Sequence, residues 1–503
     1  MKIKRDGITY TLSPKTLTAV VSNCDEKKEG KVVLPAQVEH KGKTYAVTEI
    51  GEYAFCGCSK MQSIIIPDGV QTIGAKVFRG CSELMDVFIP RSVTHIGKAA
   101  FQCYDIGYGD GYIIETFSHL TSIVVESGNP VYDSRNNCNA IIETATNMLL
   151  VGSANTIIPI GIQSIAGGAF QGCQGLTFIE IPDSVKDIYS VAFDNCSNLS
   201  SVRLHNGTTN IGDAAFSGCT SLKNIYIFGS IQKIGYHAFS GCPLESIVVD
   251  SSNPVYDSRD NCNAIIETAT NTLMEGSANT KIPSSVTQIG DNAFEGRTSL
   301  RHIDIPGTVT TIKSDAFRNC ENLVSISFSE GLNEIGLDAF NGCSSLTELV
   351  FPNSLTELGI NYFYECNSLK TLVIPNSVVS TECIGMESLL QLPQLTYLQL
   401  PPNLLIDICS SAVNYHYERD DEKDKEVGIK ITTEKDAMCF SIPMPALCQH
   451  LKLRPDCQIS VGEGAKSTIH LGDIFEGAEE TKTDEGRLDD DIPYFPEEAE
   501  YDM

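Results

Sequence analysis

The sequence has no tryptophan, no long apolar run and no excess of basic side chains, and these absences exclude several classes of protein. No apolar stretch approaches the roughly 18 residues that a membrane-spanning helix needs. The net charge of −28 disfavours nucleic acid as a partner, because that binding depends on basic side chains that displace counterions. The chain also lacks a P-loop and a GxGxxG motif after a strand. We therefore expect no membrane span, no nucleic-acid partner and no cofactor.

The N-terminus, MKIKRDGITYTLSP, has positive charges but no apolar segment behind them. A secretory signal peptide needs such a segment. We therefore expect none, and a cytoplasmic location for the chain as written. If a leader has been trimmed, a secreted or cell-surface location would fit instead.

Phenylalanine, mostly in an Ala-Phe dipeptide, recurs along the chain, and eight of the ten gaps between the recurring residues are 23 residues long. The recurring positions are Phe55, Phe78, Phe101, Phe170, Phe193, Phe216, Phe239, Phe294, Phe317, Phe340 and Phe363. One repeat, which starts at Leu176, reads LTFIEIPDSVKDIYSVAFDNCSN. This spacing fits neither a long helix nor a simple alternating strand, so it predicts a repeat architecture.

Within one repeat, the apolar positions predict a coil with several straight faces. Ile179 and Ile181 lie two residues apart, as the inward side of a short strand requires, and Pro182 ends the strand. In most repeats a glycine follows the next isoleucine, for example Gly74 and Gly212, and we expect these glycines to form a turn with positive φ. A short helical turn with Ala-Phe should follow. One coil cannot bury its own apolar side, so stacked coils must share one continuous core.

The pattern LxxIxIPxSVxxIGxxAFxGC resembles the leucine-rich repeats of the BspA type over roughly residues 45 to 402. The resemblance implies an α/β leucine-rich-repeat solenoid with a parallel β-sheet on its concave face and short helical turns on its convex side. It also implies a role in binding proteins or surfaces rather than in catalysis. Members of this family are often bacterial surface or host-contact proteins.

The 19 cysteines are an odd number, and most of them recur once per repeat. A disulfide framework needs pairs, so we expect reduced, buried thiols that pack as small hydrophobic side chains. A column with one thiol per coil also lacks the converging ligands of a metal site. We therefore expect no metal.

Near residues 128–160 and 252–284 the sequence repeats itself, with 26 identities over 31 positions. In the phase of the repeat, each copy is a 33-residue insertion directly after a predicted strand. The runs PVYDS and AIIETATN flank a polar tip, which predicts a β-hairpin. The tip has acidic and amide side chains, but Arg135 breaks the alternation of an EF-hand loop and its glycine is missing. Cys138 has no histidine within the insert. We interpret the duplicate as scaffold.

In a strand, the residues between inward positions point outward, here onto the predicted concave sheet. Several outward positions hold aromatic or basic side chains, and tyrosine and arginine are enriched at binding hot spots. The candidate ligand-binding residues are Phe88, Phe178, Arg203, Tyr226 and His302. The alternative is that β-prone residues favour strands on whichever face they occupy.

An aromatic, glycine-rich loop is predicted between Phe101 and Leu120. Tyr104, Tyr108 and Tyr112 alternate in it with glycines. Such a loop could contact a partner, or it could cover the neighbouring hairpin.

The remaining parts of the chain lie outside the repeats of residues 47–402. Residues 1–46 contain alternating apolar runs that predict an N-terminal β cap, which a repeat stack needs. Residues 403–470 match no repeat and are predicted to be a C-terminal cap or a small module. Residues 471–503 are strongly acidic and are predicted to be disordered.

These features predict a monomeric, non-enzymatic interaction scaffold that binds a protein or a glycan through the concave face. A second hypothesis is a bacterial cell-surface adhesin or display protein. A third is an unrecognised enzyme or binding module in residues 403–470, although the sequence shows no catalytic triad, metal constellation or phosphate loop.

Overall fold

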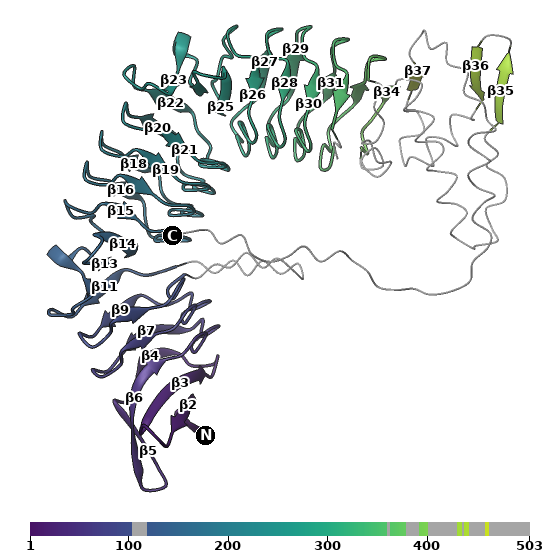
Figure 1. The fold of residues 1–503 in the computed structure, drawn as a ribbon. Helices are drawn as coiled ribbons and strands as arrows, with labels where there is room; N and C mark the ends of the chain where they lie inside the picture. The colour runs from purple at the N-terminus through teal and green to yellow at the C-terminus, as the bar shows by residue number, and fades with distance from the viewer. Residues whose placement is uncertain are drawn as a thin grey trace.

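The structure is a computed structural model that describes residues 1–102, 118–359, 363–378 and 392–400, and three further strands near the C-terminus. The described repeats form a solenoid that curves into an arch (Figure 1). No helix in the described part of the chain is long and apolar enough to cross a membrane.

Each repeat contributes one coil with a longer and a shorter strand. In one coil, β16 (Phe178–Glu180) turns Ile179 into the core and pairs in parallel with β18 (Ser201–Arg203) of the next coil. Proline then follows the strand and offers no N–H for further pairing. After the turn, β17 (Asp187–Ile188) pairs in parallel with β19 (Asn210–Ile211). Two parallel ladders therefore run along the solenoid.

We call the strands of these two ladders the long strands and the short strands. The long strands are β4 (Gly30–Val33), β7 (Met61–Ile65), β9 (Asp86–Ile89), β11 (Ser122–Val125), β16, β18, β20 (Asn224–Ile227), β22 (Ser246–Val249), β27 (His302–Ile305), β29 (Ser325–Phe328), β31 (Glu348–Val350), β33 (Thr371–Val373) and β34 (Tyr397–Leu400). The short strands are β8 (Thr72–Ile73), β10 (His95–Ile96), β15 (Ser164–Ile165), β17, β19, β21 (Lys233–Ile234), β26 (Gln288–Ile289), β28 (Thr311–Ile312), β30 (Glu334–Ile335) and β32 (Glu357–Leu358).

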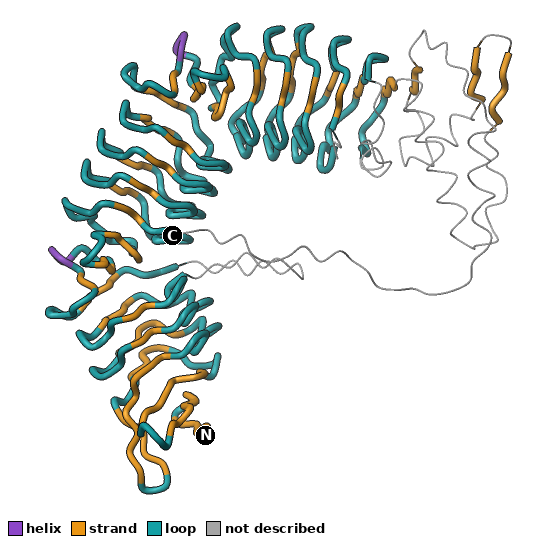
Figure 2. Tube along the Cα trace, in the orientation of Figure 1, coloured by secondary structure: helices purple, strands orange, loops and turns teal. Residues whose placement is uncertain are grey.

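The repeat fold with its parallel ladders is present, but two details differ from the predictions. In Figure 2, turns rather than strands line the inner edge of the arch, so the predicted concave position of the long strands is not confirmed. The predicted helical turns are wrong for the Ala-Phe segments, which are turns. The residue two positions before the phenylalanine has a positive φ, for example 55° at Val191 and 50° at Ala214, and an α-helix requires a negative φ. Among the described residues, only η1 (Arg135–Asn137) and η2 (Arg259–Asn261) are helical.

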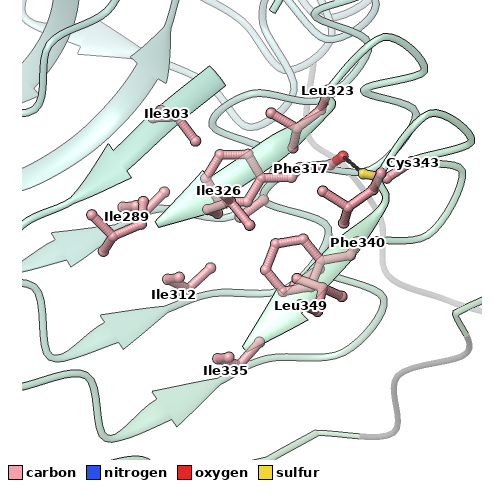
Figure 3. Close-up of a cluster of buried hydrophobic side chains, with 14 of the residues drawn as sticks. Ile289, Ile303, Ile312, Phe317, Leu323, Ile326, Ile335, Phe340, Cys343 and Leu349 are labelled. Carbon is pink, nitrogen blue, oxygen red and sulfur yellow. Dashed lines mark hydrogen bonds between the residues drawn. The ribbon is translucent and has the colours of Figure 1, made fainter. Parts of the chain in front are cut away.

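The phenylalanines of the repeat stack in columns inside the solenoid. All eleven are buried, and the ring centroids lie 5.0 Å apart for Phe193 and Phe216 and 5.6 Å apart for Phe317 and Phe340. Figure 3 shows Phe317 and Phe340 between isoleucines of the long strands and isoleucines of the short strands. Truncation of a buried phenylalanine typically costs about 3–5 kcal/mol, so this column is a main source of stability.

The cysteines of the repeat donate hydrogen bonds to the phenylalanine of the preceding coil. The Sγ of Cys343 lies 3.2 Å from the carbonyl oxygen of Phe317 (Figure 3). The same bond is made by Cys81, Cys196, Cys219, Cys242, Cys320 and Cys366. The described cysteines are free thiols, and burial raises the pKa of Cys320 to about 12. The Cys320 thiol therefore stays protonated, and the cysteines of the repeat serve as donors as well as apolar side chains.

The glycines after the short strands have a different role from the one predicted. Gly74 and Gly212 do not have positive φ. A Cβ on Gly74 would lie 2.6 Å from the backbone nitrogen of Glu52, and one on Gly212 would lie 2.5 Å from that of Ser190. The backbones of neighbouring coils approach so closely here that no side chain fits. The prediction of a positive φ at these glycines was wrong.

Antiparallel strands begin the chain and recur in both inserts. The N-terminal strands are β1 (Lys2–Arg5), β2 (Ile8–Ser13), β3 (Thr18–Cys24), β5 (Gln37–His40) and β6 (Lys43–Ile50), and β3 pairs in parallel with β6. The first insert contains β12 (Tyr132–Asp133), β13 (Ile141–Glu143) and β14 (Met148–Val151), and β14 pairs in parallel with β15. The second contains β23 (Tyr256–Asp257), β24 (Ala264–Glu267) and β25 (Thr272–Gly276), and β25 pairs in parallel with β26.

The inserts divide the solenoid into three segments with separate hydrophobic cores. These cores span residues 8–141, 138–265 and 262–398, so their boundaries fall within the inserts. The Tyr132 hydroxyl accepts a hydrogen bond at 3.0 Å from the backbone N–H of Ile96, which lies in β10, the last short strand of the first segment. Tyr256 makes the same contact with Ile234 at 3.1 Å. Each insert therefore closes one short-strand ladder and opens the next.

Three strands follow the repeats. β37 (Gln458–Val461) pairs in parallel with β34 and extends the last long-strand ladder. β35 (Lys430–Glu434) and β36 (Ala437–Ser441) form an antiparallel pair. Two predictions lie outside the described residues, namely the loop with Tyr104, Tyr108 and Tyr112 and the disordered tail of residues 471–503.

Candidate binding surface

The two ladders expose faces of different composition. On the short strands, the residue before the inward isoleucine or leucine is polar in each coil: Thr72, His95, Ser164, Asp187, Asn210, Lys233, Gln288, Thr311, Glu334 and Glu357. We call this the short-strand face. On the long strands, many outward side chains are apolar and exposed: Val33, Ile65, Phe88, Val124, Phe178, Tyr226, Val248 and Val350. We call this the long-strand face. Both faces are made of β-strands, so β propensity alone does not explain the difference.

An apolar row crosses the long-strand face of the first segment. Val33, Ile65, Phe88 and Val124 are successive cross-strand neighbours on β4, β7, β9 and β11. Their exposed fractions are 59%, 38%, 39% and 44%. Of the row, only Phe88 was a predicted site residue. Val33 was missed because it lies in the predicted cap, outside the phase of the repeat, and only its β-prone run GKVVLP signalled a strand.

A charged cluster lies on the long-strand face of the second segment. Glu180 is the register partner of Arg203 on the neighbouring strand, and its carboxylate contacts Arg203 at 3.7 Å and His205 Nε2 at 2.9 Å. The hydrogen bond from His205 and the charge of Arg203 lower the pKa of Glu180. The prediction omitted His205. His205 occupies the position that Pro182 holds in the preceding repeat, and this replacement was the sequence signal that could have identified it.

Tyr226 is held in one orientation on β20. Its hydroxyl donates a 2.7 Å hydrogen bond to Asp250, and its ring meets Phe228 edge-on with centroids 4.6 Å apart. Hydrogen bonds from Ser252 and from Tyr226 lower the pKa of Asp250 to about 2, so the acceptor is ionised at neutral pH. An aromatic side chain that is already ordered loses little entropy when it binds a partner.

The five predicted binding residues are all exposed on the long-strand face, but they do not form one compact site. Phe178, Arg203 and Tyr226 come from three consecutive coils of the second segment. Phe88 lies in the first segment, and His302 lies in the third, where its Nδ1 is 2.7 Å from the Ser325 hydroxyl. The arrangement suits contacts over an extended surface rather than a pocket.

At the tip of each insert, the acidic, basic and amide side chains contact one another. The Asp133 carboxylate accepts hydrogen bonds from Arg135 Nε at 2.8 and 3.1 Å, and Arg135 Nη1 donates to the Asn147 side chain at 2.9 Å. The second insert repeats these contacts with Asp257, Arg259 and Asn271. The tip is thus organised by its own ion pair. Within the described ranges, no group of three or more His, Cys, Asp or Glu side chains could hold a metal ion.

Comparison with protein families matches the chain to the BspA type leucine rich repeat region, in six copies, over residues 43–110, 152–262 and 274–409. These ranges cover more than half of the chain. Comparison with curated proteins finds no significant match.

Several solved structures are similar to the chain. One is a leucine rich cell surface protein from Faecalibacterium prausnitzii, with 24% identity, coverage of 75% of this chain and 89% of that chain, and a TM-score of 0.42. The pneumococcal vaccine antigen PcpA has 17% identity, coverage of 82% and 96%, and a TM-score of 0.46. A leucine-rich repeat protein from Bacteroides ovatus has 23% identity, coverage of 84% and 98%, and a TM-score of 0.35.

Proposed function

The chain belongs to the family of BspA-type leucine-rich repeat proteins, and we propose that it is a non-enzymatic scaffold that binds a protein ligand through its long-strand face. The observation that carries the proposal is the contrast between the two faces of the same coils. The short-strand face is polar along its length, whereas the long-strand face exposes valine, isoleucine, phenylalanine and tyrosine. Other exposed apolar side chains, such as Ile160 and Tyr236, lie elsewhere. On the long-strand face, however, they are direct neighbours on β4, β7, β9 and β11, and a contiguous exposed apolar patch is typical of interaction sites.

The second segment offers the best centre for the interface. Phe178 is 49% exposed, and Arg203 and Tyr226 follow on the next two coils. Tyrosine and arginine supply much of the binding energy at protein interfaces. The apolar row of the first segment would extend the contact. Aliphatic side chains such as Val33 and Ile65 suit an apolar protein surface better than a glycan, which needs many hydrogen-bonding partners.

A matched pair of variants tests the proposal. The first carries Phe88→Ala, Phe178→Ser and Tyr226→Ala on the long-strand face, and the control carries Thr72→Ala, Lys233→Ala and Glu334→Ala on the short-strand face. Circular dichroism first establishes that both are folded. Each immobilised protein is then exposed to extracts of the source cells, and the retained proteins are identified by mass spectrometry.

We expect a protein that the intact chain and the control retain and that the first variant loses. Retention of the same protein by the first variant, or its loss from the control, would place the interface elsewhere. Retention of a polysaccharide instead would contradict the proposed ligand class. The two other hypotheses, a bacterial cell-surface adhesin or display protein and an enzyme or binding module in residues 403–470, stay predictions.

A further inference from the structure

Two cysteines meet where the N-terminal strands join the first repeat. Cys24 is the last residue of β3, and Cys58 is the first member of the cysteine column of the repeats. No preceding repeat offers Cys58 a phenylalanine carbonyl. Instead, its Sγ lies 3.7 Å from the carbonyl oxygen of Asp25, and the Sγ of Cys24 lies 3.6 Å from the same oxygen. The two sulfur atoms therefore lie against one and the same carbonyl oxygen.

A surface pocket adjoins one of the two cysteines. Its volume is about 290 Å³, and Cys24 lines it together with Lys4, Asn23 and Lys27, among others. Cys24 is 4% exposed, whereas Cys58 is fully buried and does not line the pocket. A small reagent can therefore reach Cys24 first.

The surroundings of the pair assign different roles to the two sulfur atoms. The adjacent Cys58 thiol is the largest influence that lowers the pKa of Cys24, and the Lys28 ammonium group contributes in the same direction. The pKa of Cys58 is raised, first by the adjacent Cys24 thiol and then by burial. The thiolate is the form that attacks a disulfide, and of the two residues it is Cys24 that lines the pocket, so Cys24 is the nucleophile and Cys58 is the second thiol that follows it.

We propose that Cys24 and Cys58 are a redox-active pair, which a small disulfide oxidant entering the adjacent pocket converts into an intramolecular disulfide that fastens the N-terminal strands to the first repeat. The bond would join positions 34 residues apart in the sequence. Because a cross-link restricts the unfolded chain, it would stabilise the first segment.

The reaction proceeds by two exchanges. The Cys24 thiolate attacks one sulfur of the oxidant, forms a mixed disulfide and releases the other half as a thiolate. Cys58 then loses its proton, attacks the Cys24 sulfur and expels the second half. Two protein thiols are oxidised, the oxidant is reduced to two thiols, and the two protein protons end on those products.

The second segment supplies a control inside the same protein. Cys219 and Cys242 also follow each other in the cysteine column of successive coils, but both are fully buried. Their thiols donate instead to the carbonyls of Phe193 and Phe216. If access and thiolate character decide the reaction, this pair stays reduced under conditions that oxidise Cys24 and Cys58.

The test uses the full chain under native conditions with bis(2-hydroxyethyl) disulfide as the oxidant. After the reaction, free thiols are alkylated in denaturant, and peptides are mapped by mass spectrometry. We expect a cross-linked peptide pair that contains Cys24 and Cys58, and alkylated Cys219 and Cys242. Cys56 lies close in sequence and is partly exposed, so the Cys56→Ser variant should form the same cross-link. The thermal midpoint of unfolding should rise on oxidation of the intact chain but not of the Cys24→Ser variant.

Three results would overturn the proposal. Cys24 could remain reduced, or it could stop at a mixed disulfide with the reagent, which would show that Cys58 does not reach it. Cys24 could be linked to Cys56 instead. Finally, Cys219 and Cys242 could oxidise as fast as the proposed pair, which would show that the pocket and the thiolate do not select the site. The mapping needs only the intact chain, so poor folding of a variant would not obscure it.

Discussion

A buried ion pair joins the second and third segments, whereas the equivalent place between the first and second segments has none. Arg297 occupies the cysteine position of its repeat and is fully buried, and its Nη2 lies 2.5 Å from the carboxylate of Glu275 in the second insert. Its Nη1 donates to the carbonyl oxygens of Phe239 at 3.2 Å and Cys242 at 2.8 Å, both in the preceding segment. Arg297 thus makes, across the insert, the bond to a phenylalanine carbonyl that cysteine makes within a segment.

The equivalent positions between the first and second segments show which residues to substitute in a test. The residues that correspond to Glu275 and Arg297 there are Val151 and Cys173. The Arg297→Cys variant leaves a carboxylate buried without its partner, which should lower the free energy of unfolding by about 3–5 kcal/mol. The Glu275→Val variant leaves a buried guanidinium without its partner, and the same range applies.

The double variant Glu275→Val/Arg297→Cys should lose much less than the two single losses combined. No charge is left buried, and the remaining cost comes from the carbonyls of Phe239 and Cys242, which lose a donor, at about 1–3 kcal/mol. The coupling energy of the cycle should therefore exceed about 2 kcal/mol, well above the roughly 0.5 kcal/mol expected for independent sites.

The four proteins are compared by urea unfolding at neutral pH, with amide hydrogen exchange to localise the change to the second and third segments. Because the chain has three separate hydrophobic cores, the unfolding curve alone does not show which segment has changed, and amide hydrogen exchange supplies that information. Additive single losses would refute the argument, because they would show that Glu275 and Arg297 do not depend on each other. Faster exchange confined to the first segment would refute it as well.

Three further predictions concern the same packing. Burial raises the pKa of Glu275 to about 7 from its ordinary value of 4.5. Protonation of Glu275 therefore stabilises the folded state below about pH 4.5, and this contribution is lost as the pH rises through 7. In urea titrations, the stability of the intact chain relative to Glu275→Gln should fall between pH 5 and 8 by at most about 3 kcal/mol, and a rise would contradict the burial argument. In Gly276→Ala, the new Cβ would lie 2.1 Å from the Phe294 ring, so the thermal midpoint should drop with a cost of about 1–3 kcal/mol, and an unchanged midpoint would show that the ring can move. Cys343→Ala removes the donor to the Phe317 carbonyl and should cost about 1–3 kcal/mol in urea unfolding, whereas equal stability would mean that the thiol only fills space.

The repeat alone was sufficient to predict the long-strand ladder, because the properties that make it are local and periodic, whereas the short-strand ladder was not predicted. Ile179 and Ile181 are two residues apart, which is the period of a strand, and Pro182 ends the strand by its own chemistry. The outward positions of the candidate residues follow from the same period. The division of the solenoid into three segments does not follow from this period, because it depends on how each insert interrupts the stack of coils.

Other features were decided only when distant residues came together. Gly74 is required by the backbone of the neighbouring coil, while the positive φ falls at residues such as Val191, where no sequence signal marks it. In the sequence, Arg297 interrupts the cysteine column, and only the fold gives the reason, because it places Glu275 beside Arg297. Cys24 belongs to no repeat, and only the packing of β3 brings it to Cys58. Period and turn chemistry are written in neighbouring residues, whereas close approach, buried charge pairs and thiol contacts depend on the distance between coils, which only the tertiary structure sets.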